Sequence, residues 1–165
     1  LDGVYEAGDP EPGFVSVNKE NVAVVTLQGN NAAVLIDAIS QEVKNSFSMG
    51  SVDLVDIDTE VDGLINQIET LSDVVREPDG VTWIQGDYFA TANSGDMLGG
   101  TRGFTIFDSD GNIIYESGSS AEHLITSFGH YTDGRSEKRA VEFSYVAYAK
   151  NLRLLFVISK GSSVA

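Results

Sequence analysis

Residues 103–117 read Gly-Phe-Thr-Ile-Phe-Asp-Ser-Asp-Gly-Asn-Ile-Ile-Tyr-Glu-Ser. Two short runs rich in β-branched and aromatic residues flank a Ser-Asp-Gly turn. Asp-Gly between such runs is the strongest short-range signal for a β-hairpin. Upstream, residues 80–84 and 87–92 have the same strand-like composition. The whole stretch therefore predicts four consecutive antiparallel strands.

The same arrangement occurs near the N-terminus, where Asn, Gly and Ser clusters separate short apolar runs. The runs lie at 13–18, 21–27, 32–37 and 42–47. The second of them is nearly all apolar, as expected for an inner strand that is covered on both faces. A third, incomplete unit follows at 141–149 and 152–159.

The three units also resemble one another. Glu11, Glu77 and Glu142 stand at the start of each, at intervals of 66 and 65 residues (11 to 77 and 77 to 142). Self-similarity of this kind indicates a repeat architecture, and a propeller blade has about 40–45 residues. The surplus residues are assigned to excursions between blades.

The chain is therefore predicted to be all-β, with about two and a half four-stranded antiparallel β-propeller blades from a larger propeller. We assign 1–47 and 77–117 to blade-like units, 48–76 and 118–139 to excursions, and 140–165 to a partial blade. Leu64, Ile65, Ile68 and Leu71 have helical spacing, which predicts a short helix over Asp62–Leu71. The second excursion is expected to be a loop.

Two and a half blades cannot close a ring, because closed propellers have about 4–8. Open sheet edges also tend to pair with other strands. We therefore expect the remaining blades of the same protein, or other chains in a homo-oligomer or filament, to complete the sheets.

Composition narrows the function classes. The chain has 10 basic and 25 acidic residues, a formal net charge of −15. Binding to a nucleic-acid backbone needs clustered basic residues, so we expect no nucleic-acid partner. The longest apolar run, 154–158, is too short for a membrane span. The absence of cysteine excludes disulfides and thiolate chemistry.

Three longer blocks carry a family resemblance. Residues 76–84 (Arg-Glu-Pro-Asp-Gly-Val-Thr-Trp-Ile), 99–108 and 129–136 resemble the choice-of-anchor I family. Its members are secreted or surface-attached β-propellers, also described as mesenchyme-specific cell surface glycoprotein-like, and are distantly similar to calcium-dependent β-propeller phytases. The resemblance implies an extracellular, cell-surface or periplasmic location. The loop after each second strand usually carries a glutamate in that family, whereas here these loops read Gln28-Gly-Asn, Asn93-Ser-Gly and Ser159-Lys-Gly.

Candidate site residues follow from the matched blocks and from oxygen-ligand chemistry. Glu77, Asp79 and Asp96 are predicted calcium ligands, because calcium takes 6–8 oxygen ligands. Arg102, His130 and Arg135 are the predicted catalytic residues, the arginines as clamps for a phosphate group. In the competing interpretation, the repeated glutamates stabilise turns by pairing with arginine between blades, and His130 is an ordinary loop residue.

These observations give two main hypotheses for function. The first is a surface module with a structural, adhesive or assembly role, stabilised by calcium. The alternative is a calcium-dependent, phytase-like phosphoesterase. A propeller that binds a carbohydrate or peptide is a third.

Overall fold

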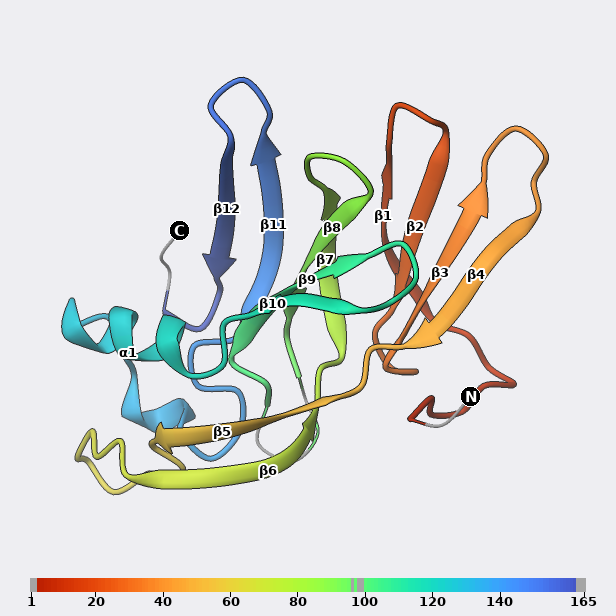
Figure 1. The fold of residues 1–165 in the computed structure, drawn as a ribbon. Helices are drawn as coiled ribbons and strands as arrows, with labels where there is room; N and C mark the ends of the chain where they lie inside the picture. The colour runs from red at the N-terminus through yellow and green to blue at the C-terminus, as the bar shows by residue number, and fades with distance from the viewer. Residues whose placement is uncertain (1–2, 96, 98–99, 163–165) are drawn as a thin grey trace.

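The computed structural model describes residues 3–95, 97 and 100–162. Two four-stranded antiparallel sheets form most of it (Figure 1). The first sheet, here called the first blade, contains β1 (Pro12–Val17), β2 (Val22–Leu27), β3 (Ala32–Asp37) and β4 (Val43–Ser48) in that order. The second blade contains β7 (Pro78–Trp83), β8 (Tyr88–Asn93), β9 (Gly103–Asp108) and β10 (Ile113–Glu116). The predicted four-stranded units are confirmed.

Two further hairpins and two short helices complete the described chain. The strands β5 (Ser51–Ile57) and β6 (Glu69–Val75) pair antiparallel and cross one end of the blades (Figure 1). The helix α1 (Ser120–Ser127) and the 3-10 helix η2 (Asp133–Arg135) follow the second blade. The hairpin of the third repeat unit, here called the third hairpin, consists of β11 (Phe143–Ala149) and β12 (Leu154–Ser159).

The first strand of each unit lies innermost, with β1 against β7 and β7 against β11. A hydrogen bond joins the first two units where Thr26 Oγ1 donates to the carbonyl oxygen of Asp79, at 2.8 Å. At Gly80 the backbones of β7 and β11 come so close that a Cβ atom would lie 2.6 Å from the carbonyl oxygen of Ser144. The units are thus arranged side by side like neighbouring propeller blades.

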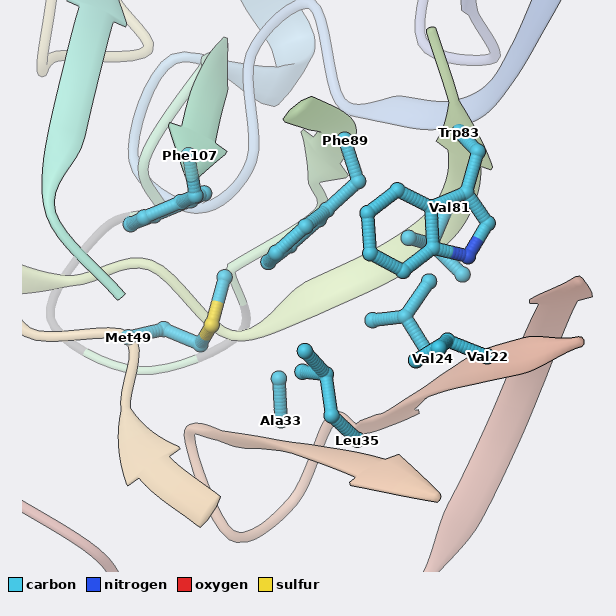
Figure 2. Close-up of a cluster of buried hydrophobic side chains, with 9 residues drawn as sticks. All are labelled: Val22, Val24, Ala33, Leu35, Met49, Val81, Trp83, Phe89 and Phe107. Carbon is cyan, nitrogen blue, oxygen red and sulfur yellow. The ribbon is translucent and has the colours of Figure 1, made fainter. Parts of the chain in front are cut away.

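An apolar core fills the space between the first and second blades (Figure 2). Phe89 is its centre and is fully buried. Its ring stacks on Phe107 at a centroid distance of 5.6 Å and meets Trp83 edge-on at 5.5 Å. A second cluster, which includes Ala92, Ile125 and Phe143, packs the second blade against α1 and β11. β8 therefore contributes to both clusters, with Phe89 in the first and Ala92 in the second.

The helix predicted over Asp62–Leu71 is wrong. Residues 62–68 form bends and loop, and β6 begins at Glu69. Leu64, Ile65 and Ile68 are exposed. A helix at this position would therefore have no neighbouring surface against which to bury its apolar stripe. The carboxylate of Asp58 instead accepts backbone N–H groups from Glu60 and Asn66 and holds the segment as a loop.

The excursion over 118–139 also differs from the expected loop, because it contains α1. The helix turns Glu122 and Ile125 inward and leaves Leu124 exposed. Its burial against the second blade stabilises an element of only eight residues, which propensity alone would not hold.

Candidate functional site

A basic cavity lies where the third hairpin begins. Its volume is about 310 Å³, and its walls are Gly134, Arg135, Lys138, Arg139, Glu142 and Lys160. Four of the six lining residues are cationic, although the chain as a whole is strongly acidic. We call these six residues the basic cavity.

Glu142 forms ion pairs with three of the four cations of the cavity. Its side chain is 2 % exposed and receives hydrogen bonds from Arg139 Nη1 at 3.0 Å and Lys160 Nζ at 3.2 Å. Arg135 forms a third ion pair with the same carboxylate through Nη2. Burial pushes the pKa of Glu142 upward, but hydrogen bonds from Arg139 and Lys160 and the charge of Arg135 outweigh it, so the pKa lies below its ordinary value. The glutamate is therefore ionised at neutral pH.

The backbone around Glu142 brings residues together that are far apart in sequence. Glu142 has a positive φ of 39°, and its N–H donates to the carbonyl oxygen of Arg139 at 2.8 Å. Its own carbonyl oxygen accepts the N–H of Lys160, which follows β12, at 2.9 Å. Arg135, at the end of η2, donates Nε–H to the carbonyl oxygen of Ala140 at 3.1 Å. The start of β11, the end of β12 and η2 thus meet at one place.

Two acidic residues of β7 and its preceding turn lie beside this cluster. Burial raises the pKa of Asp79, although the charges of Lys160 and Arg139 act in the opposite direction. Glu77 is 4 % exposed, and burial raises its pKa as well. Its Oε2 accepts the backbone N–H of Met97 at 2.8 Å. These two predicted calcium ligands therefore interact electrostatically with cations of the cavity, although neither lines it. The third predicted calcium ligand, Asp96, lies outside the described residues.

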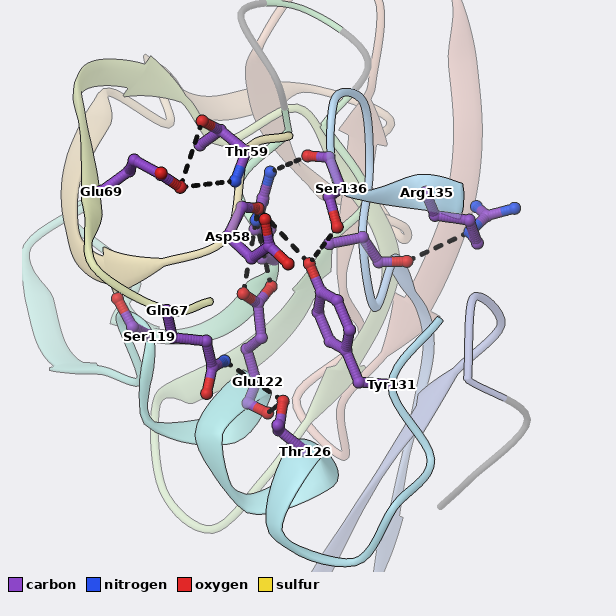
Figure 3. Close-up of polar contacts among 12 residues, drawn as sticks. Asp58, Thr59, Gln67, Glu69, Ser119, Glu122, Thr126, Tyr131, Arg135 and Ser136 are labelled. Atoms are coloured by element: carbon purple, nitrogen blue, oxygen red, sulfur yellow. Dashed lines mark hydrogen bonds and ion pairs between the residues drawn. The ribbon is translucent and has the colours of Figure 1, made fainter. Parts of the chain in front are cut away.

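Arg102 lies elsewhere, in a buried polar cluster whose members Asp58, Glu122 and Ser136 are labelled in Figure 3. Its guanidinium is fully buried and donates Nη1 to the carbonyl oxygen of Asp58 at 2.7 Å and Nη2 to that of Ser136 at 2.5 Å. The carboxylate of Glu122, on α1, lies 3.3 Å from Nη1. Arg102 thus ties the β5–β6 loop, α1 and the residues after η2 together, and it does not line the basic cavity.

Glu122, Tyr131 and Ser136 are also buried near Arg102, and Figure 3 shows the polar contacts among them. Burial raises the pKa of Glu122 despite its arginine partner, and burial together with that carboxylate raises the pKa of Tyr131 to about 12. The Tyr131 hydroxyl shares a 2.8 Å hydrogen bond with the Ser136 hydroxyl. These groups contact one another, so the arrangement favours a structural clamp.

His130 is exposed, directly after α1, and it does not line the basic cavity. The predicted catalytic set is therefore divided: Arg135 lies at the cavity, Arg102 is enclosed and His130 stands apart. Within residues 3–95, 97 and 100–162, no three His, Asp or Glu side chains gather as metal ligands would.

The sequence does not single out Lys138 and Lys160, and it places Glu142 only in the competing interpretation, as a repeated glutamate that stabilises a turn by pairing with arginine. One local signal existed, because Arg135, Lys138 and Arg139 place three cations within five residues of an acidic chain. The contributions of Glu142 and Lys160 depend on the register of the β11–β12 hairpin, which places the two residues opposite each other just outside the paired strands.

Comparison with known proteins gives one family assignment. The family model of the choice-of-anchor I domain matches residues 5–99. A search of curated proteins finds no match. Among solved structures, a chain of hydrazine synthase from Kuenenia stuttgartiensis is similar at 15 % identity with a TM-score of 0.36. That alignment covers 96 % of this chain and 45 % of the other, so this chain spans less than half the length of that protein.

In the described part of the chain, the one α-helix is far shorter than a membrane-spanning helix would be. The family model covers more than half of the sequence, including all of the first blade and the first two strands of the second. The repeated inner strands, the four-stranded units and this match agree. The chain belongs to the choice-of-anchor I family.

Proposed function

We propose that the chain is part of a secreted or surface-bound β-propeller and acts in assembly or adhesion, with its open sheets completed by further blades. The supporting observation is the third hairpin. β11 and β12 occupy the place that β1–β2 and β7–β8 have in the first two units, where a third and fourth strand follow. Among the described residues, no third strand pairs with β12.

The exposed face of this hairpin is apolar. Leu154, Phe156 and Ile158 alternate along β12 and are 50, 44 and 39 % exposed, and Tyr145 of β11 is 49 % exposed. In the first two blades the equivalent surfaces are covered by a neighbouring unit. An apolar face beside an open strand edge suits the docking of another sheet.

Solution mass tests this proposal. Light scattering of the 165-residue chain over a concentration series should show association, because copies substitute for the missing blades. Phe156→Lys should weaken self-association at least about tenfold by placing a charge in the apolar interface. Leu124→Lys is the matched control, because Leu124 is also exposed but lies on α1. A chain that stays monomeric at all concentrations, or two variants with equal effects, would count against the proposal.

Calcium binding is a finer part of the proposal, supported by Glu77 and Asp79. Both carboxyl groups have a raised pKa because burial removes water from them, and a divalent cation would relieve that cost. Added calcium should raise the melting temperature of the chain, since a ligand that binds only the folded state stabilises it. Asp79→Asn should abolish the rise and Asp108→Asn should not. An unchanged melting temperature after chelation excludes this part.

The alternative function, a phosphoric ester hydrolase, is supported by the cations of the basic cavity, since phosphoryl transfer relies mainly on charge stabilisation. Hydrolysis of phytate or p-nitrophenyl phosphate in calcium, lost in Arg135→Gln, would favour it. Absence of turnover in the presence of measurable binding would leave the assembly role in place.

A further inference from the structure

The basic side chains of this acidic chain lie either in buried ion pairs or at surface cavities. Arg76 and Arg102 are buried and paired with Glu116 and Glu122. The other eight line three surface cavities. Four are in the basic cavity, and the remaining four are Lys19, Lys44, Lys150 and Arg153. Cations outnumber carboxylates in the basic cavity, whereas another cavity places the single cation Lys44 among Glu20, Asp87 and Asp110.

The basic cavity is the most organised of these places. Three of its four cations, Arg135, Arg139 and Lys160, are held in position by the carboxylate of Glu142, and Arg135 also by the backbone at Ala140. In contrast, the larger cavity of about 680 Å³ lies among the turns β1–β2, β7–β8 and β11–β12, and its Lys19 side chain is 75 % exposed. Preorganised cations bind an anion better than mobile ones, because less side-chain freedom is lost on binding.

Arg135 also has N–H groups that neither Ala140 nor Glu142 accepts. A guanidinium carries five N–H groups, and Arg135 uses Nε and Nη2 for Ala140 and Glu142. Its side chain is 37 % exposed, and that of Lys160 is 63 % exposed, so both reach solvent at the cavity. The lining has four cationic groups and one carboxylate, and the nearby carboxyl groups of Glu77 and Asp79 interact with Arg139 and Lys160. Four cations against these three carboxyl groups leave one cation in excess.

We propose that the basic cavity binds a small multivalent oxyanion, either a phosphate group or a dicarboxylate. Arg135, Arg139 and Lys160 would donate charge-assisted hydrogen bonds to it, and Glu142 would hold these groups in position. The cavity volume of about 310 Å³ accommodates such a group. The inference does not depend on the assembly role, and it concerns binding without turnover.

Isothermal titration of the 165-residue chain tests the site, with inorganic phosphate, sulfate and succinate as separate probes at constant ionic strength. We expect saturable binding with one ion per chain. Phosphate and sulfate binding in preference to succinate indicates a tetrahedral anion, and the reverse order indicates a dicarboxylate. Sodium chloride at the same ionic strength measures the effect of screening alone.

Variants assign the binding to this cavity. Arg135→Gln and Lys160→Gln should each weaken binding about tenfold or more, because each removes a hydrogen bond to a charged group. Arg153→Gln is the matched control, since it changes the net charge by the same amount at the larger cavity. Lys160 is largely exposed, so its variant keeps the test valid if Arg135→Gln unfolds.

Three results would overturn the proposal. They are the absence of saturable binding with all three anions, unchanged affinity in Lys160→Gln, and an equal loss of affinity in Arg153→Gln. The last would mean that the anions respond to net charge and not to a site.

Discussion

At the scale of single residues, Arg102 shows how a catalytic residue type can serve the fold. A buried guanidinium needs partners for its N–H groups, and Arg102 finds them in two backbone carbonyl oxygens and the Glu122 carboxylate. These partners belong to three segments that share no strand. The residue therefore joins the β5–β6 loop, α1 and the turn after η2 at one point.

Replacing this arginine should destabilise the fold and leave the basic cavity formed. Arg102→Met is expected to lower the free energy of unfolding by about 3–5 kcal/mol, because it leaves the Glu122 carboxylate buried without its arginine partner. Arg153→Met, at an exposed position, should change it by less than about 0.5 kcal/mol. Urea unfolding followed by circular dichroism compares the two. A loss below about 1 kcal/mol for Arg102→Met would show that the clamp is not structural.

At the scale of elements, the strands of both blades could be predicted because their signals are local. The turn at Asp108 illustrates this. Its Oδ1 accepts the N–H groups of Asp110 and Asn112, and Gly111 adopts a positive φ of 89°. An Asp-Gly pair favours this turn geometry, so the hairpin can be predicted from the local sequence alone.

The β5–β6 hairpin and the basic cavity could not be predicted in this way. Ser51 pairs with Val75 across a long loop, so the strand partner is outside any local window. The helical spacing of 64–71 was misleading, because spacing implies a helix only when the apolar stripe is buried. Glu142 and Lys160 meet at the open end of a local hairpin, but the approach of Arg135 from η2 to the same carboxylate has no local signal in the sequence.

Adjacent residues of β8 provide a test of the core at this scale. Phe89 is fully buried between the blades, whereas Tyr88 is 42 % exposed. Phe89→Ala should cost about 3–5 kcal/mol, since it removes a large buried ring and leaves a cavity. Tyr88→Ala should cost less than about 1 kcal/mol. Equal losses in chemical unfolding would mean that the interface between the blades is not the main core.

At the scale of the whole molecule, charge opposes folding at neutral pH. The net charge of −15 causes self-repulsion in any compact state. Burial adds to this at Glu77, Asp79 and Glu122, each of which has a pKa raised above its ordinary value. The folded state therefore binds more protons than the unfolded state just above the ordinary carboxyl range.

Stability should consequently rise as the pH falls from 7 to about 5. A raised folded-state pKa means that stabilisation is complete below the unfolded pKa and is lost as the pH rises through the folded one. Glu142, Asp37 and Asp108 have lowered pKa values, so their stabilisation is lost only at lower pH, as it falls through their folded values. Melting temperatures from pH 7 to pH 5 measure the trend, and Asp79→Asn should reduce its slope. A constant or falling melting temperature over this range would contradict the expectation.

The position of Trp83 makes the intrinsic fluorescence of the protein a probe of the contact between the first two blades. It is the only tryptophan in the chain, and its indole Nε1 donates to the carbonyl oxygen of Ser16 at 3.0 Å, across the boundary between the first two blades. The ring is 8 % exposed and lies edge-on to Phe89. Indole fluorescence responds to water, so the emission of this chain follows the separation of the two blades without any label.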